Sequence, residues 1–303
     1  MTNSRQVSVA ILLATYNGKD WLVEQLNSLL SQSGVKVHVF ISDDFSTDGT
    51  WPLLQSLNDE RITLLPRFER FGSAAQNFFR LLRDVDLSAF DYISLADQDD
   101  IWDEDKLLRS VSTIIEHGVD VFSSNVIAFW PNGKRNLICK SQSQKPWDHF
   151  FESAGPGCTY VLKQHLVVEV TNFLKMHHSE TTDIALHDWF LYAWSRCNGY
   201  RWWIEPQPTM LYRQHVANEF GANQGLKAAF SRWQKLCNGW YRTQVLTIAS
   251  LCGSGEAWPI KRMRSYHFFD RLGLIFCINK IRRRKHERVA LAIALLMPFR
   301  GGK

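Results

Sequence analysis

The sequence predicts an α/β protein with a doubly wound, mostly parallel sheet and a helical extension at its C-terminal end. Three observations lead to this fold class. Short, β-branched apolar runs alternate with segments of helical spacing in the first third of the chain. Polar or acidic residues follow several of these runs directly, as they do where parallel strands end at a ligand site. From about Leu226 onward the pattern becomes helical, aromatic and basic.

The first elements alternate strictly between strand and helix. The run at 7–13 is continuous and apolar, and it stops at a polar loop that begins with Thr15 and Tyr16, which is typical of a buried parallel strand. The segment that follows has Leu22, Leu26 and Leu29 at helical spacing. The predicted order is strand 7–13, helix 20–31, strand 35–41, helix 48–57 and strand 61–65.

The middle of the chain continues this alternation and then contains a predicted β-hairpin. An acidic cluster stands at the end of the strand predicted at 91–96, and Pro131-Asn132-Gly133 predicts a hairpin turn after a long strand at 119–130. The remaining predicted elements are a helix at 77–85, a helix at 103–117, an apolar segment at 160–162, a helix that starts at Asp188 and a strand at 200–204.

The composition favours a folded cytoplasmic protein. Hydrophobic residues make up 45% of the 303 residues, which is enough to bury a substantial core. The six cysteines are scattered and form no CxxC pair, so neither a zinc site nor a disulfide framework is predicted. No signal peptide is recognised, and no apolar stretch reaches the ~18 residues that a membrane span needs.

The positive charge is concentrated near the C-terminal end. The formal net charge is +5, and basic residues cluster at 261–264 and 280–285 beside several phenylalanines. Two interpretations stay open: a surface that lies on anionic lipid, or a helical bundle packed on the preceding domain. Nucleic-acid binding is not expected, because no recognised module accompanies the charge. The predicted domains are 1–225, catalytic, and 226–303, basic and helical.

The acidic cluster Asp97-Gln98-Asp99-Asp100 is the first candidate site. Three neighbouring carboxylates repel one another unless a cation binds among them. Mn²⁺ and Mg²⁺ prefer oxygen ligands and keep positions open for substrate phosphates. The alternative is a solvated acidic loop, and the cluster alone does not decide between the two.

Three segments together carry a family resemblance. Residues 7–18 read Val-Ser-Val-Ala-Ile-Leu-Leu-Ala-Thr-Tyr-Asn-Gly, residues 41–50 read Ile-Ser-Asp-Asp-Phe-Ser-Thr-Asp-Gly-Thr, and residues 96–102 read Ala-Asp-Gln-Asp-Asp-Ile-Trp. In this order the sequence resembles the family-2 glycosyltransferases of the GT-A fold over roughly residues 7–220. The Asp-Gln-Asp-Asp-Ile-Trp form, with a later His-Asp-Trp, resembles the bacterial rhamnosyltransferase-like subgroup.

The resemblance implies a nucleotide-sugar site with a divalent cation, Mn²⁺ or Mg²⁺. Ala14, Tyr16 and Asp44 match the positions that contact the nucleoside, with Tyr16 against the base or ribose and Asp44 accepting from the base N–H. Asp99 matches the main metal aspartate, and Asp97 matches a residue that helps to hold ribose or metal. Asp100, next in the chain, is left with a structural role as the cap of the following helix.

One segment departs from the family pattern. The family carries an Asn-x-Gly element followed by Arg-Asn, whereas this chain has Arg70-Phe71-Gly72 followed by Gln76 and Asn77. Asn77 keeps its place in the pattern and is predicted to bind the donor. The part played by the rest of the segment near the diphosphate is not fixed by the resemblance.

The second half of the site is predicted from two further motifs. His187-Asp188 resembles the family's acidic motif at a helix start, and we assign Asp188 as the general base. An N-cap role for Asp188, or His187 as the base, are the alternatives. In the Tyr-Arg-Gln-His element, Arg213 is expected to bind diphosphate and His215 to bind metal or phosphate, with a surface loop as the alternative. Cys158 lies in a loop that resembles the acceptor side of the family and is expected to pack rather than react.

These predictions define a leading function and two competitors. The leading one is an inverting, metal-dependent glycosyltransferase that moves L-rhamnose from dTDP-L-rhamnose to a glycan or lipid-linked oligosaccharide of a bacterial surface polysaccharide, either O-antigen or capsule. A nucleotidyltransferase acting on sugar phosphates would carry a glycine-rich phosphate loop after the first strand, and the Thr15–Lys19 loop does not fit that pattern. A non-catalytic binding protein would be indifferent to the loss of Asp188.

Overall fold

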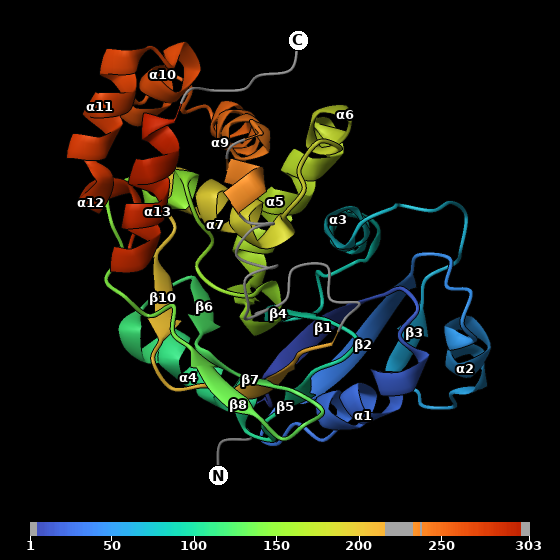
Figure 1. The fold of residues 1–303 in the computed structure, drawn as a ribbon. Helices are drawn as coiled ribbons and strands as arrows, with labels where there is room; N and C mark the ends of the chain where they lie inside the picture. The colour runs from blue at the N-terminus through green and yellow to red at the C-terminus, as the bar shows by residue number, and fades with distance from the viewer. Residues whose placement is uncertain (1–4, 216–232, 237, 298–303) are drawn as a thin grey trace. The chain divides into compact units, whose positions relative to one another are not determined.

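The computed structural model describes residues 5–215, 233–236 and 238–297 (Figure 1). These residues form two compact units that are discontinuous in the chain. The first unit holds the described residues of 1–141, 155–187 and 200–217, and the second holds those of 142–154, 188–199 and 218–303. The domain boundary predicted between residues 225 and 226 lies outside the described residues.

A seven-stranded sheet forms the centre of the first unit, with the strand order β10-β6-β9-β4-β1-β2-β3. β1 runs parallel to both of its neighbours, and only β9 is antiparallel to the strands beside it. The predicted mostly parallel sheet is therefore confirmed. Its strands are β1 (Ser8–Thr15), β2 (Lys36–Asp43), β3 (Ile62–Leu64), β4 (Tyr92–Ala96), β6 (Val121–Ser124), β9 (Val161–Lys163) and β10 (Trp202–Glu205).

Helices cover both faces of this sheet, as the doubly wound prediction requires. α1 and α4 lie on one face, and α3 and α5 lie on the other (Figure 1). Leu22 of α1 and Phe78 of α3 are fully buried against the sheet, so the apolar side of each helix faces the core. The helices of this unit are α1 (Lys19–Leu30), α2 (Thr50–Ser56), α3 (Ala74–Asp84), α4 (Lys106–His117), α5 (Gln164–Met176) and α6 (His178–Thr181).

A second, four-stranded sheet has the order β5-β11-β7-β8. The hairpin predicted around Gly133 is confirmed as the antiparallel pair of β7 and β8. The single strand predicted at 119–130 is wrong, because the chain changes sheets at Asn125. The Asn125 side chain accepts from Lys140 N at 2.6 Å and donates to Pro206 O at 2.7 Å, which fixes this break. The strands are β5 (Ile101–Trp102), β7 (Val126–Phe129), β8 (Arg135–Ile138) and β11 (Met210–Arg213).

The second unit is helical, in agreement with the predicted C-terminal extension, but it also contains earlier segments of the chain. Residues 142–154 and all of α7 except His187 belong to it. Its helices are α7 (His187–Cys197), α9 (Trp240–Leu251), α10 (Trp258–Ser265), α11 (Phe268–Phe276), α12 (Ile278–Ile281) and α13 (Lys285–Leu296), together with a 3₁₀ turn at Asp148–Phe150.

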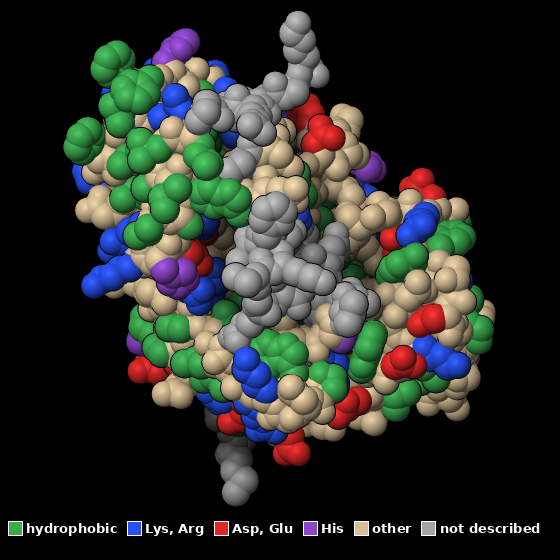
Figure 2. All heavy atoms as spheres, in the orientation of Figure 1, with side chains coloured by type: hydrophobic (Ala, Val, Ile, Leu, Met, Phe, Trp, Pro, Cys, Tyr) green, Lys and Arg blue, Asp and Glu red, His purple; other side chains and the backbone are tan. Residues whose placement is uncertain are grey.

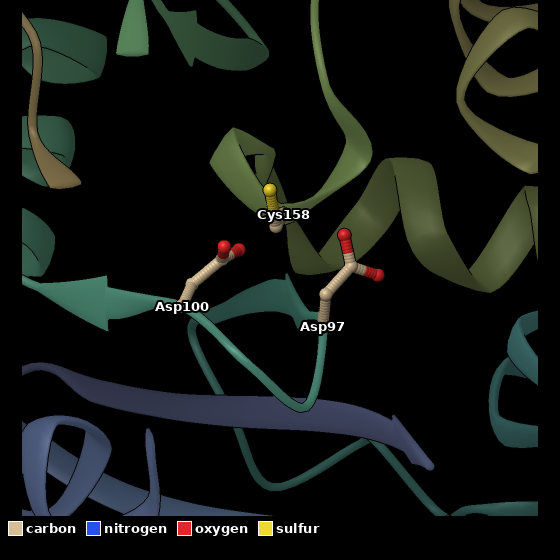
Figure 3. A group of neighbouring side chains, drawn as sticks. All are labelled: Asp97, Asp100 and Cys158. Carbon is tan, nitrogen blue, oxygen red and sulfur yellow. The ribbon is translucent and has the colours of Figure 1, made fainter. Parts of the chain in front are cut away.

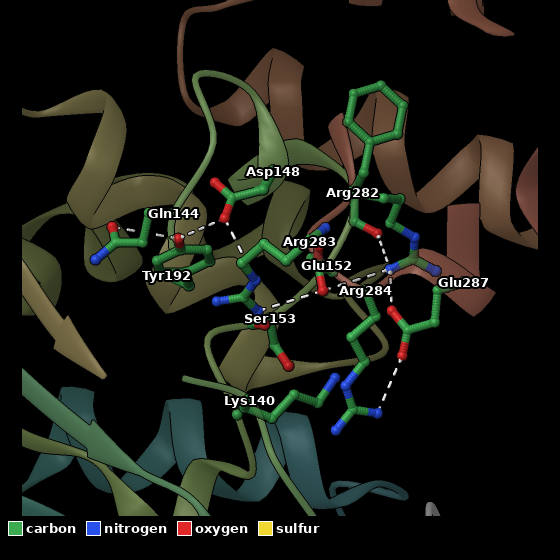
Figure 4. Close-up of polar contacts among 12 residues, drawn as sticks. Lys140, Gln144, Asp148, Glu152, Ser153, Tyr192, Arg282, Arg283, Arg284 and Glu287 are labelled. Carbon is green, nitrogen blue, oxygen red and sulfur yellow. Dashed lines mark hydrogen bonds and ion pairs between the residues drawn. The ribbon is translucent and has the colours of Figure 1, made fainter. Parts of the chain in front are cut away.

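A buried ionic cluster joins the three segments of the second unit (Figure 4). The Arg283 guanidinium lies 3.4 Å from Asp148 and 3.3 Å from Glu152, and Arg283 N donates to Glu152 at 2.7 Å. From α7, Tyr192 donates its hydroxyl to Asp148 at 3.1 Å, and Arg196 lies 3.5 Å from the same carboxylate. The basic run at 280–285 is thus not uniformly a surface feature, because Arg283 is a buried counter-ion.

Candidate active site

The carboxyl ends of β1, β2 and β4 meet at one edge of the large sheet. In the strand register Thr15 lies beside Asp43, and Leu13 lies beside Ala96, the residue before the acidic cluster. Ala14 pairs with Ser42 and is buried between these ends. The strand-end residues predicted from the sequence therefore come together in the first unit, as the topology of a parallel sheet demands.

Gln98, which the sequence prediction did not single out, holds the loop after β1. Its Oε1 accepts from Thr15 Oγ1 at 2.7 Å and from Tyr16 N at 2.9 Å, and its Nε2 donates to Tyr16 O at 2.9 Å. A Cβ on Gly18 would overlap the Gln98 amide, so the close approach requires glycine there. The sequence feature that could have identified Gln98 is its position as a neutral amide within a run of carboxylates.

Tyr16 lies at the open edge of this arrangement. Its side chain is 39% exposed, and its hydroxyl accepts from Arg70 Nη2 at 2.9 Å. The Arg70 guanidinium also lies over the Tyr16 ring, 4.8 Å from its centroid. An exposed ring with a cation on one side is a surface on which a base or ribose can stack.

Asp44 is buried behind Tyr16 and faces the segment that departs from the family pattern. Its carboxylate accepts from Phe71 N, and from Gly72 N at 2.9 Å. Burial raises the pKa of the Asp44 carboxyl, while these two hydrogen bonds and Arg70 act in the opposite direction. The Arg70-Phe71-Gly72 segment is thus placed at the predicted nucleoside side.

Asn77 is buried in α3, and its amide joins the ends of two strands. Nδ2 donates to Ser42 O at 2.9 Å and to Thr15 O at 3.5 Å, and Oδ1 accepts from Ser42 Oγ. These contacts hold β1 and β2 at the site edge. The donor-binding role predicted for Asn77 stays a prediction.

Asp99 and His215 lie together, as the predicted metal site requires. His215 Nε2 lies 2.6 Å from Asp99 Oδ2, and both side chains are largely buried. Trp21 of α1 stacks on the His215 ring at 3.9 Å between centroids, with an interplanar angle of 16°. The stack fixes the imidazole with one nitrogen directed at the carboxylate. At this distance the imidazole and the carboxylate contact each other directly. Both groups are of kinds that ligate divalent cations, so the pair brings two candidate ligands to the end of the acidic loop.

Arg213 joins the acidic loop to the end of β11. Its Nε donates to Asp99 O at 2.7 Å, and its backbone N donates to Asp100 Oδ1 at 3.1 Å. The outer end of the guanidinium pairs with the exposed Glu24 at 2.5 Å. Asp100 is therefore fixed by the backbone of β11, and the helix-cap role expected for it is wrong, because α4 begins after Asp105 without a side-chain cap.

A second group of candidate metal ligands lies beside the Asp99–His215 pair and consists of Asp97, Asp100 and Cys158 (Figure 3). Their ligand atoms all lie within 4.8 Å of one another, the carboxylates coming from the loop after β4 and the thiol from a turn at Gly157–Thr159. Burial and the neighbouring carboxylates raise the pKa of Asp100, and burial raises the pKa of the Cys158 thiol. A neutral thiol is a poor nucleophile, which agrees with the packing role expected for Cys158.

Lys106 lies fully buried next to this group. Its ammonium stands 3.4 Å from the centroid of the Trp102 ring, and burial lowers its pKa to about 7. The sequence signal for this burial was present, since Lys106 occupies a position on the apolar side of α4 together with Leu107 and Val111. In its protonated form this buried ammonium offsets part of the carboxylate repulsion.

His187 and Asp188 open α7 but have different surroundings. His187 is buried, its ring lies 4.1 Å from Phe78, and burial lowers its pKa to about 3. Gly157 faces it so closely that a Cβ would overlap His187 Nε2. Asp188 is half-buried, belongs to the second unit and accepts from Trp189 N at 2.7 Å. His187 is enclosed by Phe78 and Gly157, whereas Asp188 is the more accessible of the two side chains, so these surroundings favour Asp188 as the base.

Comparisons with known proteins identify the family. The model of glycosyl transferase family 2 matches residues 10–153. The chain is 41% identical over 288 residues to the dTDP-rhamnosyl transferase RfbG of Shigella flexneri, which covers 94% of this chain and 99% of that protein. The chain belongs to glycosyltransferase family 2. The predicted family and enzyme class are confirmed, and nothing in these two matches supports a nucleotidyltransferase.

Solved structures show the GT-A fold for this family-2 glycosyltransferase. S. aureus TarS 1–349 in complex with UDP-GlcNAc matches with a TM-score of 0.53 at 15% identity, covering 96% of this chain and 89% of that chain. The mannosyltransferase PcManGT of Pyrobaculum calidifontis, in complex with GDP-Man and Mn²⁺, matches with a TM-score of 0.52 at 16% identity, covering 97% and 86%. Among the described residues, no helix has the length and apolar character needed to cross a membrane.

Proposed function

We propose that this family-2 glycosyltransferase transfers L-rhamnose from dTDP-L-rhamnose to a glycan acceptor during synthesis of a bacterial surface polysaccharide. The observation that carries the donor assignment is the 41% identity with a dTDP-rhamnosyl transferase over nearly the whole of both chains. Tyr16, Ala14 and Asp44, at the ends of β1 and β2, are the proposed nucleoside contacts. Arg213 and Asn77 are the proposed residues on the diphosphate side.

We propose further that a divalent cation, Mn²⁺ or Mg²⁺, binds at Asp99 and His215 with Asp97 beside them. The proposal is supported by two candidate ligands side by side, an imidazole and a carboxylate, and by the further carboxylates of Asp97 and Asp100 in the same loop. The direct contact of His215 with Asp99 would open when the cation binds. A cation bound there would neutralise charge on the diphosphate and make it a better leaving group. The Trp21 stack holds the His215 imidazole in place for this role.

Asp188 is the proposed general base. The acceptor hydroxyl gives its proton to the Asp188 carboxylate while its oxygen attacks the anomeric carbon, and the bond from that carbon to the diphosphate oxygen breaks with inversion. General-base catalysis of this kind contributes about 10²–10⁴ in rate. We therefore expect Asp188→Asn to lower kcat for transfer by this factor with little change in donor affinity, whereas His187→Gln keeps the alkaline plateau of the pH–rate profile.

The donor and metal assignments are tested together with the purified full chain. Donor binding and hydrolysis are measured with dTDP-L-rhamnose, UDP-glucose, UDP-GlcNAc and GDP-mannose, each with Mn²⁺, with Mg²⁺ and with chelator. We expect preference for dTDP-L-rhamnose, loss of hydrolysis with chelator and loss in Asp99→Ala. Asp105→Ala, an exposed carboxylate paired with Arg109, is the matched control and should behave like the parent. Equal hydrolysis by Asp99→Ala would refute the metal site, and preference for another donor would refute the rhamnosyl assignment.

The acceptor is proposed to be a lipid-linked oligosaccharide, and the enzyme to work as a peripheral protein on the cytoplasmic face of the inner membrane. A lipid-linked acceptor presents its sugar at the bilayer surface, where a docked enzyme meets it at a high local concentration. This proposal is supported by the basic and aromatic character of residues 258–297.

A further inference from the structure

α13 carries an apolar stripe on its outer side. Val289, Ile293 and Leu296 are 60%, 47% and 56% exposed, and their spacing of four and three residues places them on one side of the helix. Leu291 and Leu295 on the other side are buried. A surface helix that packs on a core by one side ordinarily carries polar residues on the other. α13 is therefore apolar on both sides, and its outer stripe is uncovered within the described residues.

α11 repeats this pattern with larger side chains. Phe269 and Phe276 are 80% and 85% exposed, and their spacing of seven residues places both on the same side of the helix. Leu274 anchors the opposite side in the core of the second unit. Arg271 donates to Leu295 O at 3.1 Å and to Met297 O at 2.7 Å, so α11 is tied to the end of α13.

Hydrophobic side chains gather over these helices at the upper left of Figure 2, with basic side chains among them. We name the surface formed by the exposed apolar residues of the two helices and two flanking lysines the lipid-docking face. Its residues are Phe269, Phe276, Lys280, Lys285, Val289, Ile293 and Leu296.

The segment 258–297 carries an excess of positive charge, of which only a part lies at this face. Arg283 is buried against Asp148 and Glu152, and Lys261 and Arg264 pair with Glu256. Residues 258–297 contain ten Lys and Arg but only two acidic residues. Both acids are already paired, Asp270 with Arg262 at 3.0 Å and Glu287 with Arg284 at 3.3 Å. Lys285 is exposed and lies one turn before Val289, on the same side of α13. The face therefore combines protruding phenylalanines with a basic margin.

We propose that the lipid-docking face binds the surface of an anionic lipid bilayer. Phenylalanine and aliphatic side chains insert at the boundary between headgroups and acyl chains, and lysines at the margin pair with anionic headgroups. A nucleic acid would use the charge but leave the phenylalanines in water, and a second copy of the chain would bring two basic margins together. The proposal deepens the membrane location proposed above and does not depend on which sugar the donor carries.

Vesicle co-sedimentation of the full chain tests the proposal directly. Vesicles of phosphatidylcholine alone are compared with vesicles that also contain phosphatidylglycerol, at salt concentrations from about 0.1 M to about 0.5 M. We expect binding to the phosphatidylglycerol vesicles that weakens as salt rises and little binding to phosphatidylcholine alone. Equal binding to both kinds of vesicle, or to neither, would overturn the proposal.

Two pairs of substitutions locate the binding on this face. Phe269→Ser with Phe276→Ser should weaken vesicle binding at least about tenfold, because two apolar insertions are lost. Lys280→Gln with Lys285→Gln should weaken it about 25-fold, at about fivefold for each charge. The matched controls lie in the first unit: Phe68→Ser, at a phenylalanine that is 80% exposed, and Lys36→Gln with Lys175→Gln. These controls should bind as the parent does.

Two further readouts separate the possible outcomes. Donor hydrolysis without vesicles should be unchanged in the Phe269→Ser/Phe276→Ser chain, so a loss of vesicle binding cannot be mistaken for a loss of the active site. If sedimentation velocity shows a dimer that this variant abolishes, or if all variants bind vesicles like the parent, the lipid proposal is refuted. If vesicles bind but no donor is hydrolysed, the proposed rhamnosyl transfer fails while the lipid-docking face stands.

Discussion

Replacing Arg283 by methionine removes the central cation of the second unit. Asp148 and Glu152 are both buried, and Arg283 contacts each of them at 3.4 Å or less. Methionine fills a similar volume without charge, so the substitution tests the ion pairs rather than the packing. Two carboxylates are then left in a region that holds little water.

The magnitude follows from the partners that remain. Breaking a buried ion pair by removing one member costs about 3–5 kcal/mol. Arg196 still lies 3.5 Å from Asp148, so the loss falls near the lower end, at about 3 kcal/mol. At about 2–4 °C for each kcal/mol in a domain of about 150–250 residues, Tm should fall by roughly 6–12 °C.

The pH dependence gives a second, independent readout. Burial raises the pKa of the Asp148 carboxyl, and Arg283 and Arg196 act against this rise. The folded state therefore binds the Asp148 proton more tightly than the unfolded state does. The contribution of this proton to the free energy of unfolding is present at low pH and is lost as pH rises through the folded-state pKa. Without Arg283 that pKa rises further. The deficit of the variant should therefore be largest at neutral pH and should shrink on acidification.

Thermal unfolding of the parent and the variant, followed from neutral to acidic pH, measures both the fall in Tm and its dependence on pH. The matched control is Arg264→Met, which breaks an ion pair with Glu256 at 3.4 Å whose side chains are 55% and 78% exposed. An ion pair this exposed to solvent contributes little to stability, so Tm should hardly change. If Arg283→Met and Arg264→Met unfold at the same temperature, or if the deficit grows on acidification, the cluster does not stabilise the unit as described.

Two further predictions concern the first unit. Gly157→Ala should lower the free energy of unfolding by about 1–3 kcal/mol, because its Cβ would overlap His187 Nε2, whereas Gly155→Ala, with its nearest neighbour at 3.5 Å, should be close to the parent in a chemical denaturation curve. Equal midpoints for the two alanine variants would contradict the close approach. Gln98→Leu removes the hydrogen bonds that hold Thr15 and Tyr16, so donor KM should rise roughly tenfold with a smaller change in kcat, and steady-state hydrolysis kinetics with an unchanged KM would argue against this role.

The large sheet could be predicted from the sequence because its central strands are buried on both faces. β1 and β4 are nearly continuous buried runs, and such a run can be recognised in the sequence without knowing which strands pair with it. α5 was not predicted, although Leu166, Val167, Val170 and Leu174 have helical spacing. Its two neighbouring valines gave a strand-like local signal that tertiary packing overrides.

Site residues that directly follow a predicted strand could be predicted one at a time from the sequence. Pairs that come together only in the fold could not. Asp99 and His215 are 116 residues apart, and only the resemblance to a family brought them together before the structure did. Gln98 was passed over because its role consists of hydrogen bonds to backbone atoms, which leave no periodic pattern. Arg283 was misjudged because a run of basic residues ordinarily marks a solvated surface, and its two carboxylate partners lie 131 and 135 positions earlier in the chain.

The interleaved make-up of the second unit limits how this enzyme can be recombined with its relatives. A crossover near residue 225 would transfer α9–α13 while leaving Asp148 and α7 behind. Arg283 of the transferred helices would then face the residues that the other parent carries at positions 148 and 152. The two buried ion pairs would form only where those residues are carboxylates. A working chimera must carry residues 142–154 and 188–199 together with the C-terminal helices. Because Asp188 travels with that set, exchanging the helices also exchanges the proposed base.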